Sequence, residues 1–437
     1  MHGWAGQGFV REDVRCAGRA VYTRFEQKKQ LRRHRVEVKN LLAAQSGGPT
    51  TAINASLAGV IAGGLQSGNV GTVYGAVHGI EGVLNEQIED IGGLDLELLK
   101  QTPAAYLGSC RNKLPEADED PAVYERIFQV FAAYNIGYFI YIGGNDSMDT
   151  VSKLAMYAER KHIDIAIIGV PKTIDNDLEF TDHTPGFGSA AKYIATTVSE
   201  IAQDARVYFL KSVTIVEIMG RHAGWLTAAA ALGRNADNAA PHLIYLPEVV
   251  FSRTAFVRDI REQFEKGIHN VVVAVSEGIR DEAGQFICDS ASAALDAFGH
   301  KMLSGAGKVL EHLVANEIGC KVRSIELNVP QRCAGHLRSK TDVEEAFAIG
   351  RAGARAAASG ETGKMMAFAR VSQKPYEIRI VSAPVGQIAN REKTVPPEYI
   401  DGRHDVTAAM LDYLTPLIQG EVDVQFRDGL PVHLYRK

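Results

Sequence analysis

The chain has 437 residues, of which 46% are hydrophobic and 23% are charged, and its formal net charge is −5. This length accommodates two lobes of a large α/β protein. The acidic balance argues against a nucleic-acid-binding protein, which usually carries a basic excess, although a local basic pocket could still hold a phosphorylated ligand.

The cysteines and the hydropathy bear on the cellular compartment. The five cysteines are widely spaced and form no Cys-x-x-Cys pattern, which favours a reducing cytoplasm over a disulfide framework or a zinc site. No apolar run reaches the roughly 18 residues of a transmembrane helix, and the N-terminus lacks the apolar core of a secretory signal. We therefore expect a soluble cytoplasmic protein with neither a membrane nor a nucleic acid as partner.

Residues 1–38 are basic, with nine Arg and Lys against four Asp and Glu. We interpret this segment as a poorly ordered extension or as sequence upstream of the true start. An interaction arm or a targeting segment is the alternative, and the acidic residues argue against targeting.

Strand and helix patterns alternate along the chain. Apolar, β-branched runs end in glycine or polar residues and are followed by helical periodicity. The predicted strands are 38–44, 137–142, 163–170, 212–218 and 270–275, and the predicted helices are 52–65, 148–160, 223–232, 342–359 and 405–419. The alternation indicates parallel sheets with helices on both faces, whose carboxyl ends could bring five strand ends to one cleft.

Two glycine-rich turns follow predicted strands, at 46–54 and 143–147. Glycine lets backbone amides approach a phosphate, and a following helix adds its positive dipole end. In the second turn Asn145 and Asp146 supply oxygen atoms of the kind that Mg²⁺ prefers. A tight turn without ligand at the first site, and helix capping at the second, are the alternatives.

The segment 171–177 reads PKTIDND and follows a buried strand pattern. A kinase-type reaction needs a carboxylate that accepts the hydroxyl proton and a cation near the transferred phosphoryl group. This loop could supply both, and a solvated surface turn is the alternative.

Seven ordered motifs resemble those of the phosphofructokinase superfamily, most of all its pyrophosphate-dependent branch. They span about residue 38 to at least residue 360 and comprise 46–48, 107–109 with Arg111, 143–147, 171–177, 219–221, 276–278, and Arg323 with 331–332. The resemblance implies an α/β, two-lobed phosphofructokinase-like fold, with parallel-rich sheets sandwiched by helices and the active site in the cleft between lobes. We assign 39–186 plus about 331–390 to a phosphate-donor lobe and 187–330 plus about 391–437 to a sugar-phosphate lobe.

The resemblance also implies an activity. This is the reversible, Mg²⁺-dependent transfer of a phosphoryl group from pyrophosphate to the 1-hydroxyl of fructose 6-phosphate, a step of glycolysis and gluconeogenesis. An ATP-dependent 6-phosphofructokinase and a non-catalytic regulatory homologue are the alternatives. In the family one phosphate-binding arginine comes from a neighbouring subunit, so a homodimer or homotetramer is expected.

The family's site residues carry over in four sets. The catalytic set is Asp175 as the base, Lys172 as the electrostatic stabiliser and Asp146 as the barrier to ATP. The sugar-phosphate set is Thr173, Ile174, Asp175, Met219, Gly220, Arg221, Glu277, Arg323 and Arg332. The donor set is Gly47, Arg111 and Gly144, and the metal set is Asn145 and Asp177.

Positions 146 and 172 indicate the donor, because ATP-using relatives typically have glycine at both. Asp146 would place a carboxylate where the α-phosphate of ATP must lie, and like charges that close in a desolvated cleft repel strongly. Three departures from the family concern other sites. Asn145 replaces a metal-binding Asp, Val329 replaces a substrate-contacting His, and Ser212 replaces an arginine.

Overall fold

The computed structural model describes residues 38–288 and 305–436. The predicted extension 1–38 therefore lies outside the described residues, except for Val38. Residues Lys39–Lys437 form one unit, and it contains two mainly parallel sheets, which confirms the predicted α/β class.

The first sheet has seven strands in the order β11-β10-β5-β4-β1-β2-β3. Their bounds are β1 (Lys39–Gln45), β2 (Val70–Ala76), β3 (Ile88–Asp90), β4 (Ile136–Gly143), β5 (Ala166–Pro171), β10 (Lys364–Ser372) and β11 (Glu377–Pro384). The strands from β10 to β2 are parallel, whereas the edge strands β3 and β11 are antiparallel to their neighbours. Strand β1 pairs with both β2 and β4, so the strand order reverses there, and ligands of open α/β sheets bind at such a point.

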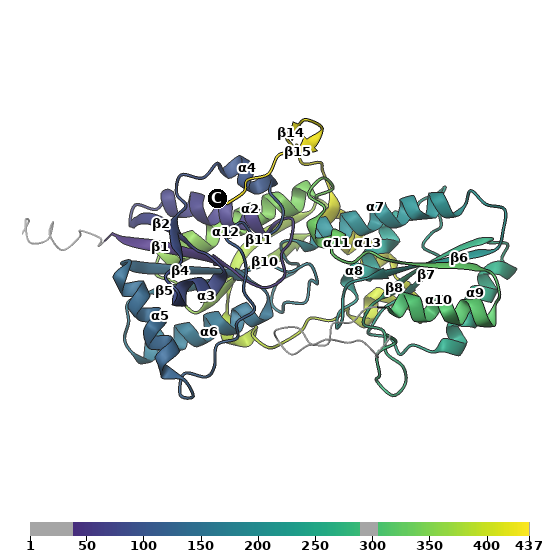
Figure 1. Cartoon of the computed structure of the whole chain (residues 1–437), viewed down its shortest axis with the longest axis horizontal. Coiled ribbons are helices and arrows are strands. Elements are labelled where there is room, and N and C mark those ends of the chain that lie inside the picture. The colour runs from purple at the N-terminus through teal and green to yellow at the C-terminus, as the bar shows by residue number, and fades with distance from the viewer. Residues whose placement is uncertain (1–37, 289–304, 437) are drawn as a thin grey trace, which may run out of the picture. The chain divides into compact units, whose positions relative to one another are not determined.

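The strands of this sheet are apolar because helices cover both faces. All eight residues of β4 are buried, as expected of a central parallel strand. Alternate residues enter two different cores: Phe139 and Tyr141 pack with α5 and α6, while Ile140 and Ile142 pack with α2 and α12. Figure 1 shows α2 and α12 above the sheet and α5 and α6 below it.

Helices α2 and α12 lie in backbone contact although they are far apart in the sequence. A Cβ atom at Gly59 of α2 would lie 2.0 Å from the carbonyl oxygen of Phe347 in α12. Small residues on α2 therefore let the two helices pack as one layer over the sheet.

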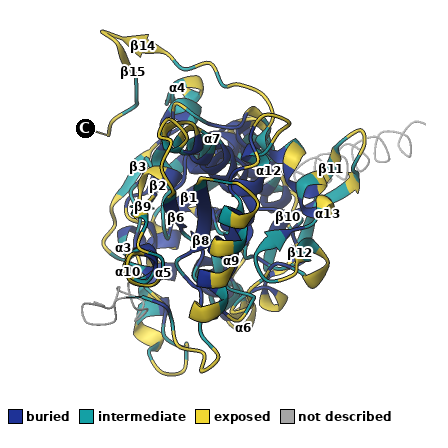
Figure 2. Cartoon of the chain, turned by 90° about the vertical axis from the view of Figure 1, so that its right-hand side faces the viewer, coloured by how far each residue is buried: buried dark blue, intermediate teal, exposed yellow. Residues whose placement is uncertain are grey.

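The second sheet has four parallel strands in the order β7-β8-β6-β9. They are β6 (Ser212–Ile218), β7 (Leu243–Tyr245), β8 (Asn270–Ser276) and β9 (Lys321–Glu326). In β6, Val213 and Ile215 enter one core and Val216 and Ile218 the other, again with the alternation of a covered strand. Figure 2 shows α9 with an exposed outer face in front of buried strands.

The remaining elements connect and cover these sheets. The α-helices are α2 (Ile53–Leu65), α3 (Gly79–Leu84), α4 (Leu96–Gln101), α5 (Pro121–Ala133), α6 (Asn145–Arg160), α7 (Phe187–Ala205), α8 (Trp225–Ala229), α9 (Arg253–Glu265), α10 (Ala306–Glu317), α11 (Pro330–Cys333), α12 (Lys340–Ala358) and α13 (Ala408–Leu414). The 3-10 helices are η1 (Ala230–Gly233), η3 (Val385–Gln387), η4 (Pro397–Tyr399) and η5 (Thr415–Ile418), and the short strands are β12 (Ile400–Asp401), β13 (Asp405–Val406), β14 (Phe426–Arg427) and β15 (Leu430–Pro431).

The predicted elements agree with the structure except at 223–232, which holds the short helix α8 followed by the 3-10 helix η1, and near the C-terminus. Four predicted strands match β1, β4, β6 and β8 within one residue at each end, and β5 begins three residues later than predicted. The predicted single helix over 405–419 is wrong: β13, α13 and η5 share this range. Pro416 has no amide hydrogen for an α-helical bond, and the chain tightens into the 3-10 helix there.

The end of the chain lies against the first sheet's helices. The Gln425 amide donates to Gln101 Oε1 at 3.1 Å, and the Leu434 amide donates to Thr102 Oγ1 at 2.8 Å. The lobe boundaries stay a prediction. Residues 425–434, which the prediction places in the sugar-phosphate lobe, contact α4 and the residue after it, both of which it places in the donor lobe.

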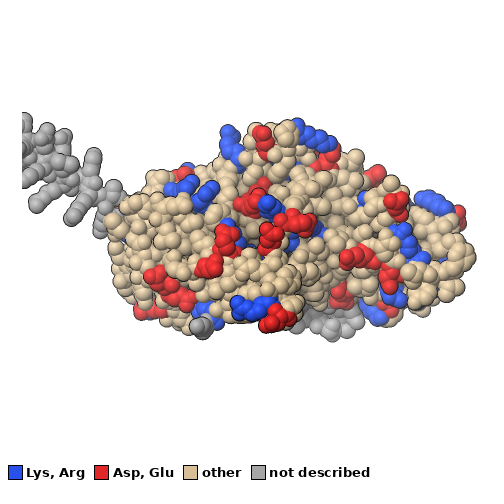
Figure 3. Space-filling model, turned by 90° about the horizontal axis from the view of Figure 1, so that it is seen from above, with Lys and Arg blue, Asp and Glu red and all other residues tan. Residues whose placement is uncertain are grey.

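Figure 3 shows acidic and basic side chains interspersed on the face it presents. Among the described helices, none combines the length and the apolarity that crossing a membrane requires.

Candidate active site

A cavity of about 570 Å³ lies at the carboxyl ends of strands from both sheets. Its walls are formed by the segments that follow β1, β4, β5, β6 and β8, together with α11 and residues near 390. The predicted site residues that line it are Gly47, Arg111, Gly144, Asn145, Asp146, Lys172, Thr173, Ile174, Asp175, Asp177, Met219, Arg221, Glu277 and Arg332. Five strand ends thus meet in one site.

Lys172 follows directly after β5 and is only 2% exposed. Its Nζ donates to the carbonyl oxygen of Gly48 at 2.7 Å. Burial lowers the pKa of Lys172 to about 8, although the nearby Asp175 and Asp177 act in the opposite direction. The Lys172 side chain is therefore fixed against the first glycine-rich turn, and it lines the cavity.

A side chain would be crowded at Gly47, the second residue of the first glycine-rich turn. Gly47 has a φ of +77°, and a Cβ atom there would lie 3.2 Å from Lys172 Nζ. Ser109 Oγ donates to the Gly47 carbonyl oxygen at 2.6 Å from the other side. The left-handed backbone favours glycine here, and a Cβ atom would in addition crowd the end of the lysine side chain.

Asp175 and Asp177 lie two residues apart and both line the cavity. Burial raises the pKa of Asp175. Burial and the proximity of Asp175 raise the pKa of Asp177 to about 7. The Thr173 hydroxyl accepts from the Asp175 amide at 3.1 Å and lies 3.4 Å from Asp175 Oδ2. The pair offers a proton acceptor, and a bound cation would relieve the repulsion between the two carboxylates.

These oxygen atoms fit a magnesium ion that keeps part of its hydration shell. Mg²⁺ is commonly held by one or two carboxylates together with waters and phosphate oxygens. Within the described residues no three His, Cys, Asp or Glu side chains form a group that could hold a metal. Asn145 is already engaged, since its Oδ1 accepts from the Asn390 amide at 2.6 Å and its Nδ2 donates to the Arg391 carbonyl oxygen. Asp177 is thus the better placed of the two predicted metal ligands.

The second glycine-rich turn carries an ion pair that the sequence did not predict. Asp146 Oδ1 lies 3.2 Å from Lys113 Nζ, and both residues line the cavity. The lysine offsets part of the carboxylate's charge. Lys113 lies two residues after Arg111, and this spacing is the signal that could have identified it.

The other wall carries the residues predicted to bind the sugar phosphate. Arg221 Nε and Arg332 Nε are buried and have no hydrogen-bond partner among the described residues. Each therefore keeps a donor for an anionic ligand. Burial, with Asp175 acting in the same direction, raises the pKa of Glu277 to about 7.

Comparison with known proteins agrees with this geometry. The family model for phosphofructokinase matches residues 40–334. The chain belongs to the phosphofructokinase family.

Relatives of this phosphofructokinase-family chain at 39–44% identity are named for the pyrophosphate-dependent branch. It is 44% identical over 406 residues to a pyrophosphate–fructose 6-phosphate 1-phosphotransferase of Xanthomonas campestris, covering 91% of this chain and 96% of the relative. It is 42% identical over 400 residues to the protein of that name from Halomonas elongata, covering 90% and 94%. A crystal structure of the pyrophosphate-dependent phosphofructokinase of Nitrosospira multiformis matches with a TM-score of 0.82 and 37% identity, over 91% of this chain and 96% of that one.

Two residues carried over from the phosphofructokinase family do not line the cavity. The Gly220 amide donates to Glu277 Oε1 at 3.3 Å, so Gly220 acts on the site through that carboxylate. Arg323 lies on β9, half exposed, with its Nη1 3.8 Å from Asp204 Oδ2, and it borders a different hollow beside α7. Its role in binding a phosphate stays a prediction.

Besides Lys113, three cavity residues outside the predicted motifs line this phosphofructokinase-family site. Asn390 and Glu392 line it from an irregular segment, and His222 Nδ1 lies 3.7 Å from Glu392 Oε2. No strand or glycine pattern marks residues 390–392, so the sequence carried no signal for them. His222 directly follows the predicted motif 219–221.

Proposed function

We propose that this chain is a pyrophosphate-dependent 6-phosphofructokinase that transfers a phosphoryl group reversibly from pyrophosphate to the 1-hydroxyl of fructose 6-phosphate. The names of its relatives support the reaction. The observation that carries the proposal is the buried Lys172 held against the Gly48 carbonyl oxygen, on the same loop as Asp175.

Asp175 is the general base in this mechanism. It accepts the proton of the 1-hydroxyl while the hydroxyl oxygen attacks phosphorus in line with the leaving phosphate. The raised pKa of Asp175 gives the carboxylate more proton affinity than an exposed aspartate has, which suits a base working near neutral pH. The Thr173 hydroxyl orients it through their mutual contacts.

Lys172 and the first glycine-rich turn bind the donor. The amides of the turn and the ammonium group lie where negative charge develops on the transferred group and on the leaving phosphate. Because Lys172 is already fixed by Gly48, little reorganisation is needed during the reaction. Arg111 and Gly144 border the same part of the cavity.

We assign Mg²⁺ to Asp177, with the remaining ligands coming from phosphate oxygens and water. When bound, it supplies neutralisation of the charge on pyrophosphate. Asp177, rather than Asn145, is favoured because the Asn145 amide is engaged by residues 390 and 391.

Asp146 accounts for the choice of pyrophosphate over ATP. Its side chain, anchored by Lys113, occupies space beside the donor turn where a longer donor would extend. The remaining charge of the carboxylate disfavours a further phosphate.

Arg221, Arg332, Met219 and Glu277 bind fructose 6-phosphate, and the orphaned Nε atoms of the two arginines support this role. Arg323 lies outside the cavity of its own chain, so we propose that it serves the site of a second copy in a homodimer or homotetramer. We also propose a cytoplasmic location, consistent with cysteines that form no disulfide in the described residues.

A two-donor assay tests the proposal. The purified chain is given fructose 6-phosphate and Mg²⁺ with either pyrophosphate or ATP as sole donor, and fructose 1,6-bisphosphate is measured. We expect turnover with pyrophosphate and at least about 100-fold less with ATP at equal concentration. Comparable or faster turnover with ATP would identify an ATP-dependent enzyme, and no turnover with either would identify a non-catalytic homologue.

A further inference from the structure

Asn176 lies between Asp175 and Asp177 in the loop 171–177, here called the catalytic loop, but it does not line the cavity. Asp175 and Asp177 line the cavity, whereas Asn176 is 0% exposed. Its φ is +56°, in the left-handed region that few residues other than glycine and asparagine adopt readily. This backbone conformation therefore stands between the base and the predicted metal ligand.

The side chain of Asn176 is held by two residues from near the C-terminus. Its Nδ2 donates to the Tyr413 hydroxyl at 2.9 Å, and Lys393 Nζ lies 3.4 Å from its Oδ1. The backbone amide of Lys393 donates to the Asp177 carbonyl oxygen at 2.8 Å. The Asn176 side chain and the Asp177 carbonyl oxygen are thus both bound by residues from outside the loop.

The same two residues are themselves anchored. The Tyr413 hydroxyl donates to the Asp182 carbonyl oxygen at 2.7 Å, and Lys393 Nζ donates to the carbonyl oxygens of Thr181 and Asp182 at 3.0 and 2.8 Å. Lys393 Nζ also lies 5.3 Å from the centre of the Trp225 ring.

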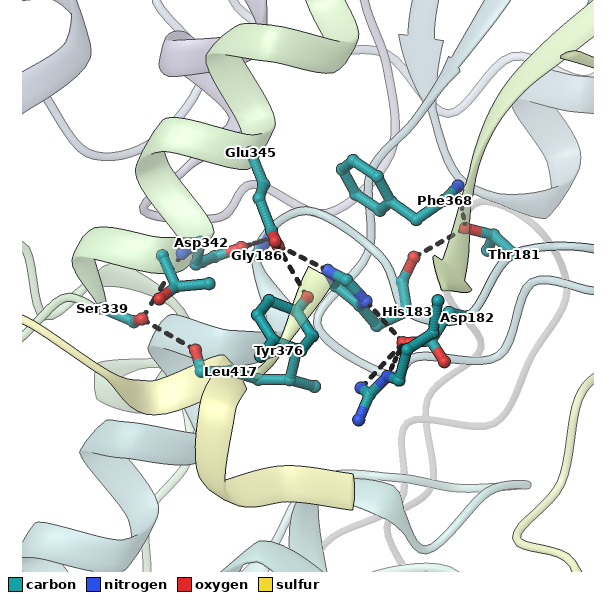
Figure 4. A network of polar contacts seen from close by, with 12 residues as sticks. Thr181, Asp182, His183, Gly186, Ser339, Asp342, Glu345, Phe368, Tyr376 and Leu417 are labelled. Atoms are coloured by element: carbon teal, nitrogen blue, oxygen red, sulfur yellow. Dashed lines mark hydrogen bonds and ion pairs between the residues drawn. The ribbon is translucent and has the colours of Figure 1, made fainter. Parts of the chain in front are cut away.

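Ion pairs and hydrogen bonds hold residues 181–184, which follow the loop 171–177 in the chain (Figure 4). His183 contacts Asp182 Oδ1 at 2.8 Å and Glu345 Oε2 of α12 at 2.7 Å, and Arg370 of β10 also binds Asp182. The Thr184 hydroxyl then donates to the Thr173 carbonyl oxygen at 2.8 Å, which returns the network to the catalytic loop. The contacts run continuously from Thr173 through 181–184 to Asn176.

We propose that Asn176 is a positioning residue, whose left-handed backbone, clamped by Tyr413 and Lys393, aims Asp175 and Asp177 into the cavity. The inference rests on the proposed function, because it assumes that Asp175 is the base. A residue that disfavours positive φ would rotate the adjoining peptide planes and re-aim both carboxylates. Misplacement of a reacting group by about 1 Å can cost about 100-fold in rate.

Substitution of Asn176 separates the backbone from the side chain. Asn176→Ala loses the clamp and disfavours positive φ, and we expect kcat with pyrophosphate to fall about 10- to 100-fold with both KM values within about 3-fold of wild type. Asn176→Gly loses the clamp but accepts positive φ, and should recover at least about 3-fold of the lost kcat. Both variants are assayed at a temperature at which each is fully folded, because the same backbone penalty also lowers the stability of Asn176→Ala more than that of Asn176→Gly.

Asn135 provides the matched control. It also has a positive φ, of 49°, but lies just after α5 and outside the cavity lining. Asn135→Ala carries a comparable backbone penalty, so it should lower the melting temperature and leave kcat unchanged. Tyr413→Phe removes one hydroxyl from the clamp and leaves the sequence of the loop unchanged. It should lower kcat several-fold at unchanged KM, and it can be measured even if the Asn176 variants do not fold.

The outcomes distinguish this inference from the proposed function. If wild-type protein shows no turnover with pyrophosphate, the proposed function fails. If wild type is active and Asn176→Ala keeps kcat within about 3-fold, or Asn176→Gly is no better than Asn176→Ala, the positioning role is wrong. If the Asn176 variants do not fold, an unchanged kcat in Tyr413→Phe overturns it.

Discussion

The ammonium group of Lys172 and the carbonyl oxygen of Gly48 are 2.7 Å apart. This hydrogen bond joins the loop after β5 to the turn after β1, two strand ends separated in the sheet by β4. The contact is possible because Gly47 has no side chain to occupy the space of the lysine. Pyrophosphate would therefore meet a cation already in place.

Lys172→Met should remove most of the electrostatic stabilisation that we propose Lys172 gives to the transferred phosphoryl group. We expect kcat with pyrophosphate to fall about 100- to 1,000-fold, the range for loss of one preorganised electrostatic group, with the KM for fructose 6-phosphate little changed. Lys192→Met is the matched control, because Lys192 is also buried and also donates to backbone carbonyl oxygens, but outside the cavity. It should lower stability and spare kcat; an equal loss of kcat in both variants would argue against a specific role for Lys172.

Asp175→Ser should lower kcat by orders of magnitude with little change in KM, as measured by steady-state kinetics. The pH profile gives an independent check. Burial raises the pKa of Asp175 and the charge of Lys172 opposes the shift, so kcat/KM of the wild type should fall on acidification at a pH above the usual carboxyl range. In Lys172→Met this acid limb should move to higher pH, and a limb that moves lower would contradict the assignment of the base.

Asp146→Gly should raise turnover with ATP by at least about 10-fold, measured in the two-donor assay. Asp146→Asn keeps the shape and removes the charge, so it separates the two causes of exclusion. Because Lys113 already offsets part of the charge, we expect Asp146→Asn to gain less than Asp146→Gly. Equal gains would mean that charge alone excludes ATP, and no gain in either variant would refute the role of Asp146.

His183 should make the folded state less stable as the pH rises above neutrality. Burial alone would lower its pKa, but hydrogen bonds to Asp182 and Glu345 outweigh burial and raise the pKa from 6.5 to about 9. The protonated ring is therefore bound more tightly in the folded state. The resulting stability, on the order of 3 kcal/mol, is fully present below pH 6.5 and is lost as the pH rises through about 9.

Urea unfolding at pH 6, 7.5 and 9.5 measures this effect. The stability difference between wild type and His183→Gln should shrink over that range, whereas His312→Gln, on the exposed face of α10, should change stability by less than about 0.5 kcal/mol at each pH. A difference that stays constant with pH would show that His183 is neutral in the folded protein.

The sequence predicts the elements of this site better than it predicts the contacts between them. Strands β4 and β5 are continuous apolar runs because helices cover both faces, and the loop after β5 is marked by its charged residues. Asp175 and Lys172 are therefore identifiable from local composition together with the family resemblance.

Tertiary packing accounts for what the sequence does not reveal. The Lys113–Asp146 ion pair and the clamp of Tyr413 on Asn176 join residues whose proximity depends on the whole fold. The segment 405–419 is predicted as one helix, yet it is broken near Pro416 and carries Tyr413. Hydrophobic periodicity reports that a helix is buried, but not which partner its polar atoms meet.

The close contact of α2 with α12 also bears on biosynthesis. The first sheet and its helical cover are completed only by residues Lys340–Pro384, which leave the ribosome after every strand of the second sheet. Until then α2 has no partner for its glycine-rich face, and β5 has no neighbour on its outer edge. The stretch 40–334 that matches the family lacks α12, β10 and β11, so we expect it not to fold by itself and the first sheet to stay incomplete while the second is synthesised.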